Sequence, residues 1–379
     1  MQYRKMNKHN IDVSLYGLGC MRLPTVEVDG KNKINHPHAI SMIRYAIDHG
    51  CNYVDTAYPY HGGESELVVG EALRDGYRNK TYLASKLPIW LLKFPQDCDK
   101  YLNEQLTKLQ TDHIDFYLMH GLDSDSWLKA KELGVLDFMK HAKEDGRIRY
   151  IGFSFHDEYP VFKEILDSFD WDICQIQFNL LDEYIQATVD GLRYAGEKNV
   201  PVVIMEPLKG GLLTNSIPSY VQQIWDDAPI KRTPLEWAFR WLYNFPETSV
   251  ILSGASSLTQ LQQALACFEQ PIIPNCMSAE ELATTTAVQQ AYAARIKVGC
   301  TGCQYCIPCP NKVNIPLVFA LYNNAFMYES LEDCKEQYAK LLAKDEGVPN
   351  CIECGICEGL CPQHLSIIEM LKEAHEALK

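Results

Sequence analysis

Two runs of cysteines near the end of the chain carry the most specific chemical pattern in the sequence. Nine of the 15 cysteines fall between residues 300 and 361, and eight of the nine form the two runs. These eight are Cys300, Cys303, Cys306, Cys309, Cys351, Cys354, Cys357 and Cys361. The second run reads C-x2-C-x2-C-x3-C-P, a spacing that wraps three thiolates around one face of an iron–sulfur cubane and directs the fourth elsewhere. The first run is one residue shorter at its last step.

Eight thiolates in two such runs predict two 4Fe–4S clusters. Structural zinc is the main alternative, but such zinc sites typically use two separated C-x2-C pairs rather than three cysteines in tandem. In proteins with two clusters, the fourth cysteine of each run often ligates the other cluster. Cys309 would then join the second run and Cys361 the first, and the sequence leaves this pairing open. Cys334 and the six cysteines before residue 300 are interpreted as packed side chains.

Three ionisable residues stand where strands are expected to end. Asp55, Lys86 and His120 each follow a short apolar or β-branched segment, and Tyr60 lies in the loop after Asp55. In a parallel barrel the carboxyl ends of the strands form the functional face. Successive strands would therefore point Asp55, Lys86 and His120 at one mouth.

These four side chains form a chemically coherent set. A tyrosine hydroxyl with a pKa of about 10 is a weak acid at neutral pH, but an adjacent ammonium favours the phenolate. Lys86 would supply that charge, Asp55 would hold Lys86, and His120 would donate a hydrogen bond to a substrate carbonyl. The set predicts proton transfer by Tyr60 as general acid or base. Tyr58 lies nearby, and Tyr60 is preferred on spacing alone.

From about residue 14 to 268, strand-like segments alternate with amphipathic segments of helical period, a pattern typical of repeated βα units. Strands are predicted near 15–21, 53–55, 81–86, 114–119, 148–154, 173–177, 200–205 and 250–252. Helices are predicted at 37–49, 64–74, 96–109, 128–144, 160–168, 184–198, 234–244 and 259–268. Eight of each over roughly 250 residues predict an α/β fold of the (β/α)8 TIM-barrel type. An open doubly wound sheet is disfavoured, because Gly17-Leu18-Gly19 lacks the third glycine of a dinucleotide-binding fingerprint.

The chain is therefore divided into three parts. Residues 1–275 are assigned to the barrel, 276–298 to a connecting helix, and 299–379 to a small, mainly helical iron–sulfur domain. Ser278, with Glu281 three residues later, offers a capping box for the connecting helix. Within the last part, helices are predicted at 316–343 and 367–378.

Composition limits the classes of function. The chain has 35 Lys plus Arg against 49 Asp plus Glu, and its net charge of −14 argues against a nucleic-acid binder, which normally shows a basic surface. Hydrophobic residues make up 47%, too many for a disordered chain. No run approaches the roughly 18 consecutive apolar residues of a membrane helix, and the first ten residues lack an apolar signal core. We expect a cytoplasmic protein with neither membrane nor nucleic acid as a partner.

The motifs around the ionisable residues resemble the aldo-keto reductase family. They are Asp55-Thr56-Ala57-x-x-Tyr60, Glu64-Ser65-Glu66, Ser85-Lys86 and Leu118-Met119-His120, and the similarity continues through 152–156, 175–179, 205–211 and 250–257. It covers residues 10 to 270. In that family the matching Asp, Tyr, Lys and His form the catalytic tetrad of NAD(P)H-dependent carbonyl reduction. The cysteine-rich tail resembles the subgroup that carries a ferredoxin-type 4Fe–4S domain.

The resemblance also implies a nicotinamide dinucleotide site. The residues implied to line it are Ser154, Gln177, Glu206, Pro207, Leu208, Gly210, Ser253, Gly254, Ala255, Ser256 and Gln260. Many NADPH-using members have Lys and Arg in the stretch matching 254–263, whereas this chain has no basic residue there. Since a phosphate without a cationic partner loses its strongest hydrogen bonds, the choice between NADP and NAD stays open. Lys209, Lys231 or Arg232 could compensate from another loop.

The resemblance implies an oxidoreductase that reduces a small-molecule aldehyde or ketone to an alcohol, or runs the reverse reaction, with NADP or NAD. Trp90 would lie over the barrel mouth, where it could stack on a substrate ring or pack the loop. The alternative hypothesis is an electron-transfer or redox-sensing module whose barrel binds a ligand or flavin without carbonyl turnover. Direct electron flow from cluster to nicotinamide is disfavoured without a flavin, because a hydride carries two electrons and a cluster one. A structural role for the clusters, or the docking of an external electron carrier, requires less chemistry.

Overall fold

The computed structural model describes all 379 residues, which form two compact units. Met1–Gly211 and Arg232–Ser278 make up one, called the barrel unit below. Leu212–Lys231 and Ala279–Lys379 make up the other, called the tail unit. The segment Leu212–Lys231 lies inside the sequence range predicted for the barrel, yet it belongs to the tail unit.

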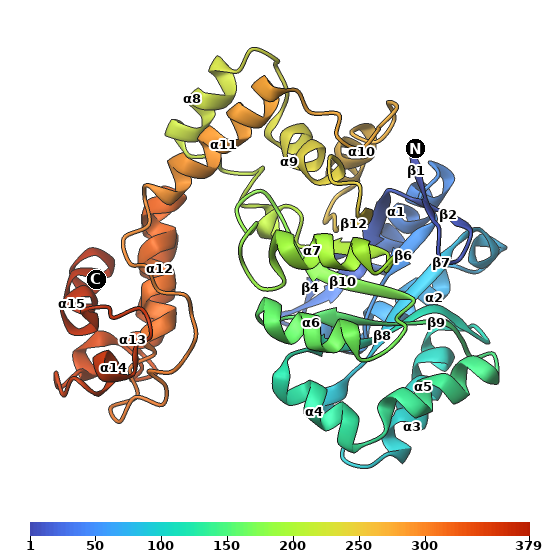
Figure 1. The fold of residues 1–379 in the computed structure, drawn as a ribbon, viewed down its shortest axis with the longest axis horizontal. Coiled ribbons are helices and arrows are strands. Elements are labelled where there is room, and N and C mark those ends of the chain that lie inside the picture. The colour runs from blue at the N-terminus through green and yellow to red at the C-terminus, as the bar shows by residue number, and fades with distance from the viewer. The chain divides into compact units, whose positions relative to one another are not determined.

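Eight parallel strands close into a barrel in the barrel unit (Figure 1). Their order around the barrel is β10-β11-β12-β3-β6-β7-β8-β9. The strands are β3 (Tyr16–Gly19), β6 (Tyr53–Asp55), β7 (Tyr82–Leu87), β8 (Ile114–Leu122), β9 (Ile148–Phe155), β10 (Ile173–Gln177), β11 (Val202–Met205) and β12 (Thr248–Ser253). The predicted (β/α)8 fold is confirmed, and every strand overlaps its predicted range.

Helices follow the strands as the sequence pattern predicts, with one difference. They are α1 (His36–Asp48), α2 (Ser65–Ala72), α3 (Gln96–Leu109), α4 (Ser124–Glu132), α5 (Val135–Glu144), α6 (Tyr159–Asp167), α7 (Thr188–Glu197), α9 (Pro234–Tyr243) and α10 (Leu258–Ala266). The prediction of a single helix at 128–144 is wrong. Gly134 adopts a left-handed φ of 66° and separates α4 from α5, a conformation that glycine adopts without strain.

Two antiparallel hairpins in the barrel unit were not predicted. The first joins β1 (Tyr3–Met6) to β2 (Ile11–Ser14), and the second joins β4 (Thr25–Val28) to β5 (Lys31–Ile34). Met6 and Val13 are buried in the same apolar cluster as the barrel residues Phe116 and Val203. The first hairpin therefore closes the end of the barrel at which the strands begin, and leaves the carboxyl ends of the strands as the open mouth.

The tail unit is helical. It contains α8 (Ser219–Asp227), α11 (Ala279–Ala293), α12 (Ile315–Met327), α13 (Leu331–Leu342), α14 (Ile356–Leu360) and α15 (Ile367–Leu378). Helix α8 packs on α11, where the rings of Tyr220 and Tyr292 are 5.9 Å apart and Arg295 lies 3.5 Å from the Tyr220 centroid. The helical segment predicted at 316–343 forms two helices, α12 and α13. None of the helices combines the length and apolar character needed to cross a bilayer.

Candidate active site

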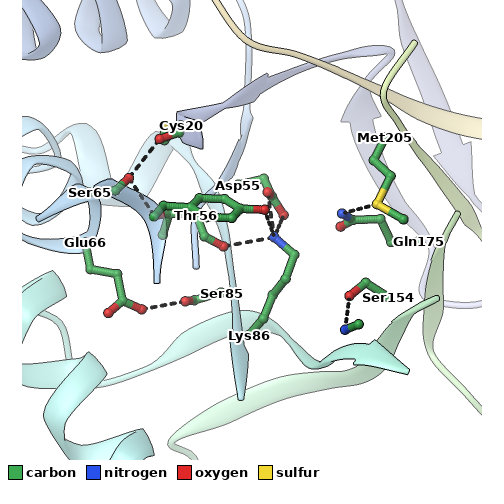
Figure 2. A network of polar contacts seen from close by, with 12 residues as sticks. Cys20, Asp55, Thr56, Ser65, Glu66, Ser85, Lys86, Ser154, Gln175 and Met205 are labelled. Atoms are coloured by element: carbon green, nitrogen blue, oxygen red, sulfur yellow. Dashed lines mark hydrogen bonds and ion pairs between the residues drawn. The ribbon is translucent and has the colours of Figure 1, made fainter. Parts of the chain in front are cut away.

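A buried ion pair joins the carboxyl ends of two neighbouring barrel strands. Asp55 ends β6 and Lys86 lies in β7, and parallel pairing sets Asp55 against Ala84. Lys86 Nζ donates to both carboxylate oxygens of Asp55 at 2.7 Å and to the Thr56 carbonyl oxygen at 3.0 Å (Figure 2). Lys86 is 0% and Asp55 2% exposed. A buried charge persists only beside a partner, so each side chain holds the other in place.

A second buried carboxylate supports the backbone of β7. Ser85 alternates with Lys86 along the strand, so it points to the other face, where it donates to Glu66 Oε1 at 2.7 Å. Gln105 Nε2 donates to the same Glu66 oxygen at 2.6 Å and to the Lys86 carbonyl oxygen at 3.1 Å. Helices α2 and α3 therefore fix the segment of strand that carries Lys86.

Tyr60 reaches the ion pair from the loop after β6. Its hydroxyl is 3.5 Å from Lys86 Nζ, and its ring lies edge-on to that of His120 at 6.0 Å. Burial raises the pKa of Tyr60, and the opposing effect of Lys86 does not cancel this shift. The net direction differs from the lowering expected from Lys86 alone. The phenol consequently keeps its proton at neutral pH.

Tyr58 is directed away from the ion pair. Its hydroxyl donates to Glu104 Oε1 at 3.1 Å, and its ring packs edge-on against Tyr101 at 5.2 Å. Burial and the hydrogen bond to Glu104 raise the pKa of Tyr58 to about 12. Tyr60 is thus the tyrosine of this loop that lies beside Lys86.

His120 lies between Tyr60 and Trp90, whose ring is 5.0 Å from that of His120. Burial, reinforced by Lys86 and His156, holds the pKa of His120 well below its ordinary value. The neutral imidazole has a single N–H to donate. Its Nδ1 is buried without a hydrogen-bond partner, so the site offers an unsatisfied polar atom to a ligand.

Ser154 of β9 and Gln175 of β10 lie across the barrel mouth from Lys86 (Figure 2). Ser154, predicted to contact the cofactor, accepts a hydrogen bond from Gly121 N at 2.8 Å. Gln177, also predicted, donates to Asp182 at 2.9 Å and accepts from Gln186 at 3.3 Å. Both side chains therefore already have partners within the chain.

Gln175 lies beside Ser154 in the sheet and was not predicted as a site residue. It is 2% exposed, its Oε1 has no hydrogen-bond partner, and its Nε2 lies 3.5 Å from Met205 Sδ. A buried amide oxygen in this state fits a ligand with an N–H to give, such as the carboxamide of a nicotinamide. Residues two apart in a strand face the same side, so the choice of Gln177 could have drawn attention to Gln175.

Arg22, at the end of the turn after β3, approaches two of the predicted cofactor segments. Its Nη2 is 3.5 Å from Glu206 Oε1, and its carbonyl oxygen accepts a hydrogen bond from Ser256 Oγ at 3.2 Å. A Cβ built on Gly210 would lie 3.3 Å from Arg22 Nη2, and one on Gly254 would lie 3.3 Å from Arg22 Cβ. Gly210 and Gly254 thus leave room for the Arg22 side chain. Arg22 was not among the residues predicted from the sequence.

The remaining predicted cofactor residues lie along the same two segments. Pro207, Ser253 and Ala255 are buried, Leu208 is half-buried, and Gln260 accepts a hydrogen bond from Ser256 N at 2.9 Å. Of the three cations considered as phosphate partners, Lys209 is paired with Asp182 at 2.5 Å and Arg232 lies 5.4 Å from the Trp237 ring centroid. Lys231 belongs to the tail unit. Arg22 is therefore the cation that stands between the two segments.

The eight cysteines of the two runs line two cavities in the tail unit. One is lined by Cys306, Cys309, Cys351, Cys354 and Cys357. The other is lined by Cys300, Cys303, Cys306 and Cys361. Cys309 thus lies with the second run and Cys361 with the first, while Cys306 borders both cavities. No three His, Cys, Asp or Glu side chains are grouped closely enough for a single metal ion. Thiolates spread around two larger spaces fit polynuclear clusters.

Two segments of the chain match the profiles of known protein families. Residues 16–280 match the profile of the aldo/keto reductase family, and residues 299–366 match that of a 4Fe-4S dicluster domain. YqkF, an uncharacterized oxidoreductase of Bacillus subtilis (strain 168), is 28% identical over 295 residues, which cover 69% of this chain and 90% of the relative. The aldo-keto reductase YhdN of the same bacterium is 28% identical over 227 residues, covering 57% of this chain and 65% of YhdN.

Solved structures share the barrel. The holo form of the aldo-keto reductase AKR11C1 from Bacillus halodurans is 25% identical, with a TM-score of 0.64, and the match covers 76% of this chain and 96% of that one. An aldo-keto reductase from Klebsiella pneumoniae, solved in complex with NADPH, has the same fold, with a TM-score of 0.60 at 24% identity over 76% of this chain and 96% of that one.

Proposed function

The chain belongs to the aldo/keto reductase family and carries a 4Fe–4S dicluster domain, and we propose that it reduces an aldehyde or ketone with NADPH or NADH, with Tyr60 as the proton donor. The observation that carries this proposal is the position of Lys86 Nζ, 2.7 Å from both Asp55 oxygens and 3.5 Å from the Tyr60 hydroxyl. The reverse reaction, oxidation of an alcohol, uses the same groups with Tyr60 as base. The substrate is a small molecule.

A bound nicotinamide dinucleotide would supply the hydride. We assign its nicotinamide end to Gln175 and Gln177, because the unsatisfied Gln175 Oε1 can accept from a carboxamide N–H. We assign its phosphates to segments 206–210 and 253–260, where Arg22 supplies a positive charge. The complex of the Klebsiella pneumoniae relative with NADPH supports this class of cofactor.

The side chains around Lys86 carry out the proton transfer. As hydride reaches the carbonyl carbon, charge develops on the carbonyl oxygen, and the N–H of His120 stabilises that charge by a hydrogen bond. Tyr60 then transfers its hydroxyl proton to this oxygen, which completes the alcohol and leaves a phenolate. Lys86 stabilises the phenolate, Asp55 keeps Lys86 charged, and solvent returns the proton to Tyr60.

In the tail unit we propose two 4Fe–4S clusters with crossed ligand sets. Cys300, Cys303, Cys306 and Cys361 would hold one, and Cys309, Cys351, Cys354 and Cys357 the other, as the linings of the two cavities suggest. Anaerobically purified protein should contain about eight irons per chain, the content of two such cubanes. Zinc in place of iron would contradict this assignment.

Paired tyrosine variants test the reaction. Tyr60→Phe should lower kcat for carbonyl reduction by about 10²-fold or more, the range for loss of a general acid. Tyr58→Phe is the matched control, because its hydroxyl binds Glu104 on α3 and should leave kcat within twofold. Both variants should bind NADPH as the wild type does. Equal activity of Tyr60→Phe and wild type would refute the role of Tyr60. A wild-type protein that binds the cofactor but reduces no aldehyde or ketone would favour the redox module.

A further inference from the structure

Strand β8 has one residue more than β9 in the segment that carries His120. Met119 pairs with Phe153 and Leu122 with Phe155, so β8 takes three residue steps where β9 takes two. His120 and Gly121 form this bulge, and Gly121 has a left-handed φ of 65°. Bulges at the rim of a barrel bend the strand and redirect a side chain. Here the redirected side chain is that of His120.

The hydroxyl of Ser154 holds the bulge on both sides of His120. It accepts a hydrogen bond from Gly121 N at 2.8 Å (Figure 2, dashed line at Ser154). It also donates to the Met119 carbonyl oxygen at 3.5 Å. Ser154 is 1% exposed, so water does not compete for these backbone groups. The bulge interrupts the regular ladder at this point, and Ser154 supplies the partner that the Gly121 N–H would otherwise lack.

The His120 side chain has no polar anchor at Nδ1, which is buried and unpartnered. Its contacts in the barrel mouth are the rings of Tyr60 at 6.0 Å and Trp90 at 5.0 Å. Ring contacts of this kind are weaker and less directional than a hydrogen bond to a charged or polar group. The direction in which the imidazole points is therefore set mainly by the backbone of the bulge.

We propose that Ser154 is a positioning residue, whose hydroxyl fixes the bulge of His120 and Gly121 and thereby aims the His120 imidazole at the substrate carbonyl. The proposal rests on the proposed carbonyl reduction. It gives Ser154 a task distinct from the cofactor contact that the family resemblance implies. A residue that only contacts the cofactor changes cofactor affinity, whereas a residue that aims His120 changes kcat and acts through His120.

Kinetics of two variants measure this difference in the full chain. Ser154→Ala should lower kcat by about 10- to 100-fold, since a displacement of about 1 Å at a reacting centre costs up to about 10²-fold. Gly121→Ala should lower kcat similarly with Ser154 intact, because a side chain is strained at a φ of 65° although only His156 Cδ2, at 3.8 Å, lies near the new Cβ. The Kd for NADPH should stay within twofold in both variants.

Ser14→Ala is the matched control for loss of a buried serine. Ser14 is buried like Ser154, accepts a hydrogen bond from Asn52 N at 2.9 Å and donates to the Tyr16 carbonyl oxygen at 2.7 Å, but it lies at the closed end of the barrel. Its removal should affect stability about as much as Ser154→Ala and leave kcat within twofold. A general loosening of the barrel would instead lower kcat in both variants.

A His120→Ala background tests whether Ser154 acts on kcat through His120. There, adding Ser154→Ala should lower kcat by no more than about twofold, because the group that Ser154 positions is already gone. An equal loss in both backgrounds, or a Kd for NADPH raised in proportion to the loss of kcat/KM, would overturn the proposal and leave Ser154 as a cofactor contact.

The orientation of His120 can also be read without turnover. In protein labelled with 15N-histidine, the His120 imidazole signal, assigned by its loss in His120→Ala, should shift in Ser154→Ala and Gly121→Ala but not in Ser14→Ala. An unchanged signal in Ser154→Ala would refute the positioning role. A wild-type protein without carbonyl reduction would instead refute the proposed function, and the spectra would still decide whether Ser154 holds His120.

Discussion

The ion pair between Lys86 and Asp55 allows stability and activity to be separated. Lys86→Met removes two hydrogen bonds of 2.7 Å from a carboxylate that is 2% exposed. Removing one member of a buried ion pair costs about 3–5 kcal/mol, and replacing both by neutral groups of similar size is often close to neutral. We therefore expect about 3–5 kcal/mol of destabilisation from Lys86→Met and from Asp55→Asn alone, and less than about 2 kcal/mol from the double variant.

The coupling between the two sites follows from these values. Two single losses of at least about 3 kcal/mol against a double loss below about 2 kcal/mol give a coupling of at least about 4 kcal/mol. All three variants should nevertheless lose carbonyl reduction by about 10²-fold or more, since each lacks either Lys86, which lies beside Tyr60, or the Asp55 carboxylate, which holds Lys86 in place. Activity therefore follows the presence of Lys86 and Asp55, whereas stability follows only whether their charges are matched.

Urea unfolding followed by tryptophan fluorescence provides the assay, because five of the six tryptophans belong to the barrel unit. Burial raises the pKa of Asp55 even beside Lys86, so in Lys86→Met the carboxyl becomes easier still to protonate. A carboxyl whose pKa is raised by folding stabilises at low pH and loses that contribution as pH rises through the folded pKa. The penalty of Lys86→Met should therefore be larger at pH 8 than at pH 5. Additive losses in the double variant would refute the assignment of a buried ion pair.

Three further outcomes follow from the site. Because burial raises the pKa of Tyr60, kcat/KM for carbonyl reduction should stay level from about pH 6 to 9 while alcohol oxidation rises with pH; initial rates in both directions measure this. Arg22→Gln should weaken NADPH binding by about threefold to tenfold, a moderate effect because the Arg22 side chain is half exposed; an unchanged Kd in fluorescence titration would contradict its assignment. NADPH added without substrate under anaerobic conditions should leave the visible absorption of the clusters unchanged, because no flavin is proposed to convert a hydride into single electrons; rapid bleaching would contradict this.

The barrel and the sites at its strand ends were predictable because both depend on short-range patterns. Asp55 ends β6 and Lys86 is the last residue but one of β7, and both strands can be recognised from a few consecutive residues. The parallel barrel brings the carboxyl ends of its strands to one mouth. The second hairpin could also have been predicted from the sequence, although it was not. Its turn contains Asp29-Gly30, a pair of residues that strongly favours a hairpin. Helix α8 is amphipathic but was not predicted, because it lies between β11 and the barrel helix α9 and so has no place in a count of alternating βα units.

Other features depend on contacts between distant parts of the chain. Arg22 and Glu206 are 184 residues apart, so nothing near Arg22 in the sequence indicates that it stands at the predicted cofactor segments. The bulge at His120 could not be predicted from the sequence either, because it is defined by the register of β8 against β9 and not by β8 alone. The net rise in the pKa of Tyr60 has the same origin. The charge of Lys86 could be anticipated from residue types, whereas the extent of burial, which outweighs it, requires the folded structure.

The electron balance of the proposed reaction predicts that the clusters are dispensable for carbonyl reduction. In that reaction a hydride from NADPH would deliver both electrons and Tyr60 would deliver the proton, so no step in the barrel would require an electron from the tail. The residues of the proton path all belong to the barrel unit, and all eight cysteines of the two runs belong to the tail unit. Iron can be removed by oxidation and chelation, with iron analysis and tryptophan fluorescence to confirm cluster loss and an intact barrel. We expect kcat of the cluster-free protein to stay within about twofold of that of the intact protein. The clusters would then have a structural role or exchange electrons with a one-electron carrier outside the chain. A loss of activity with an intact barrel would instead show that the clusters take part in the reaction.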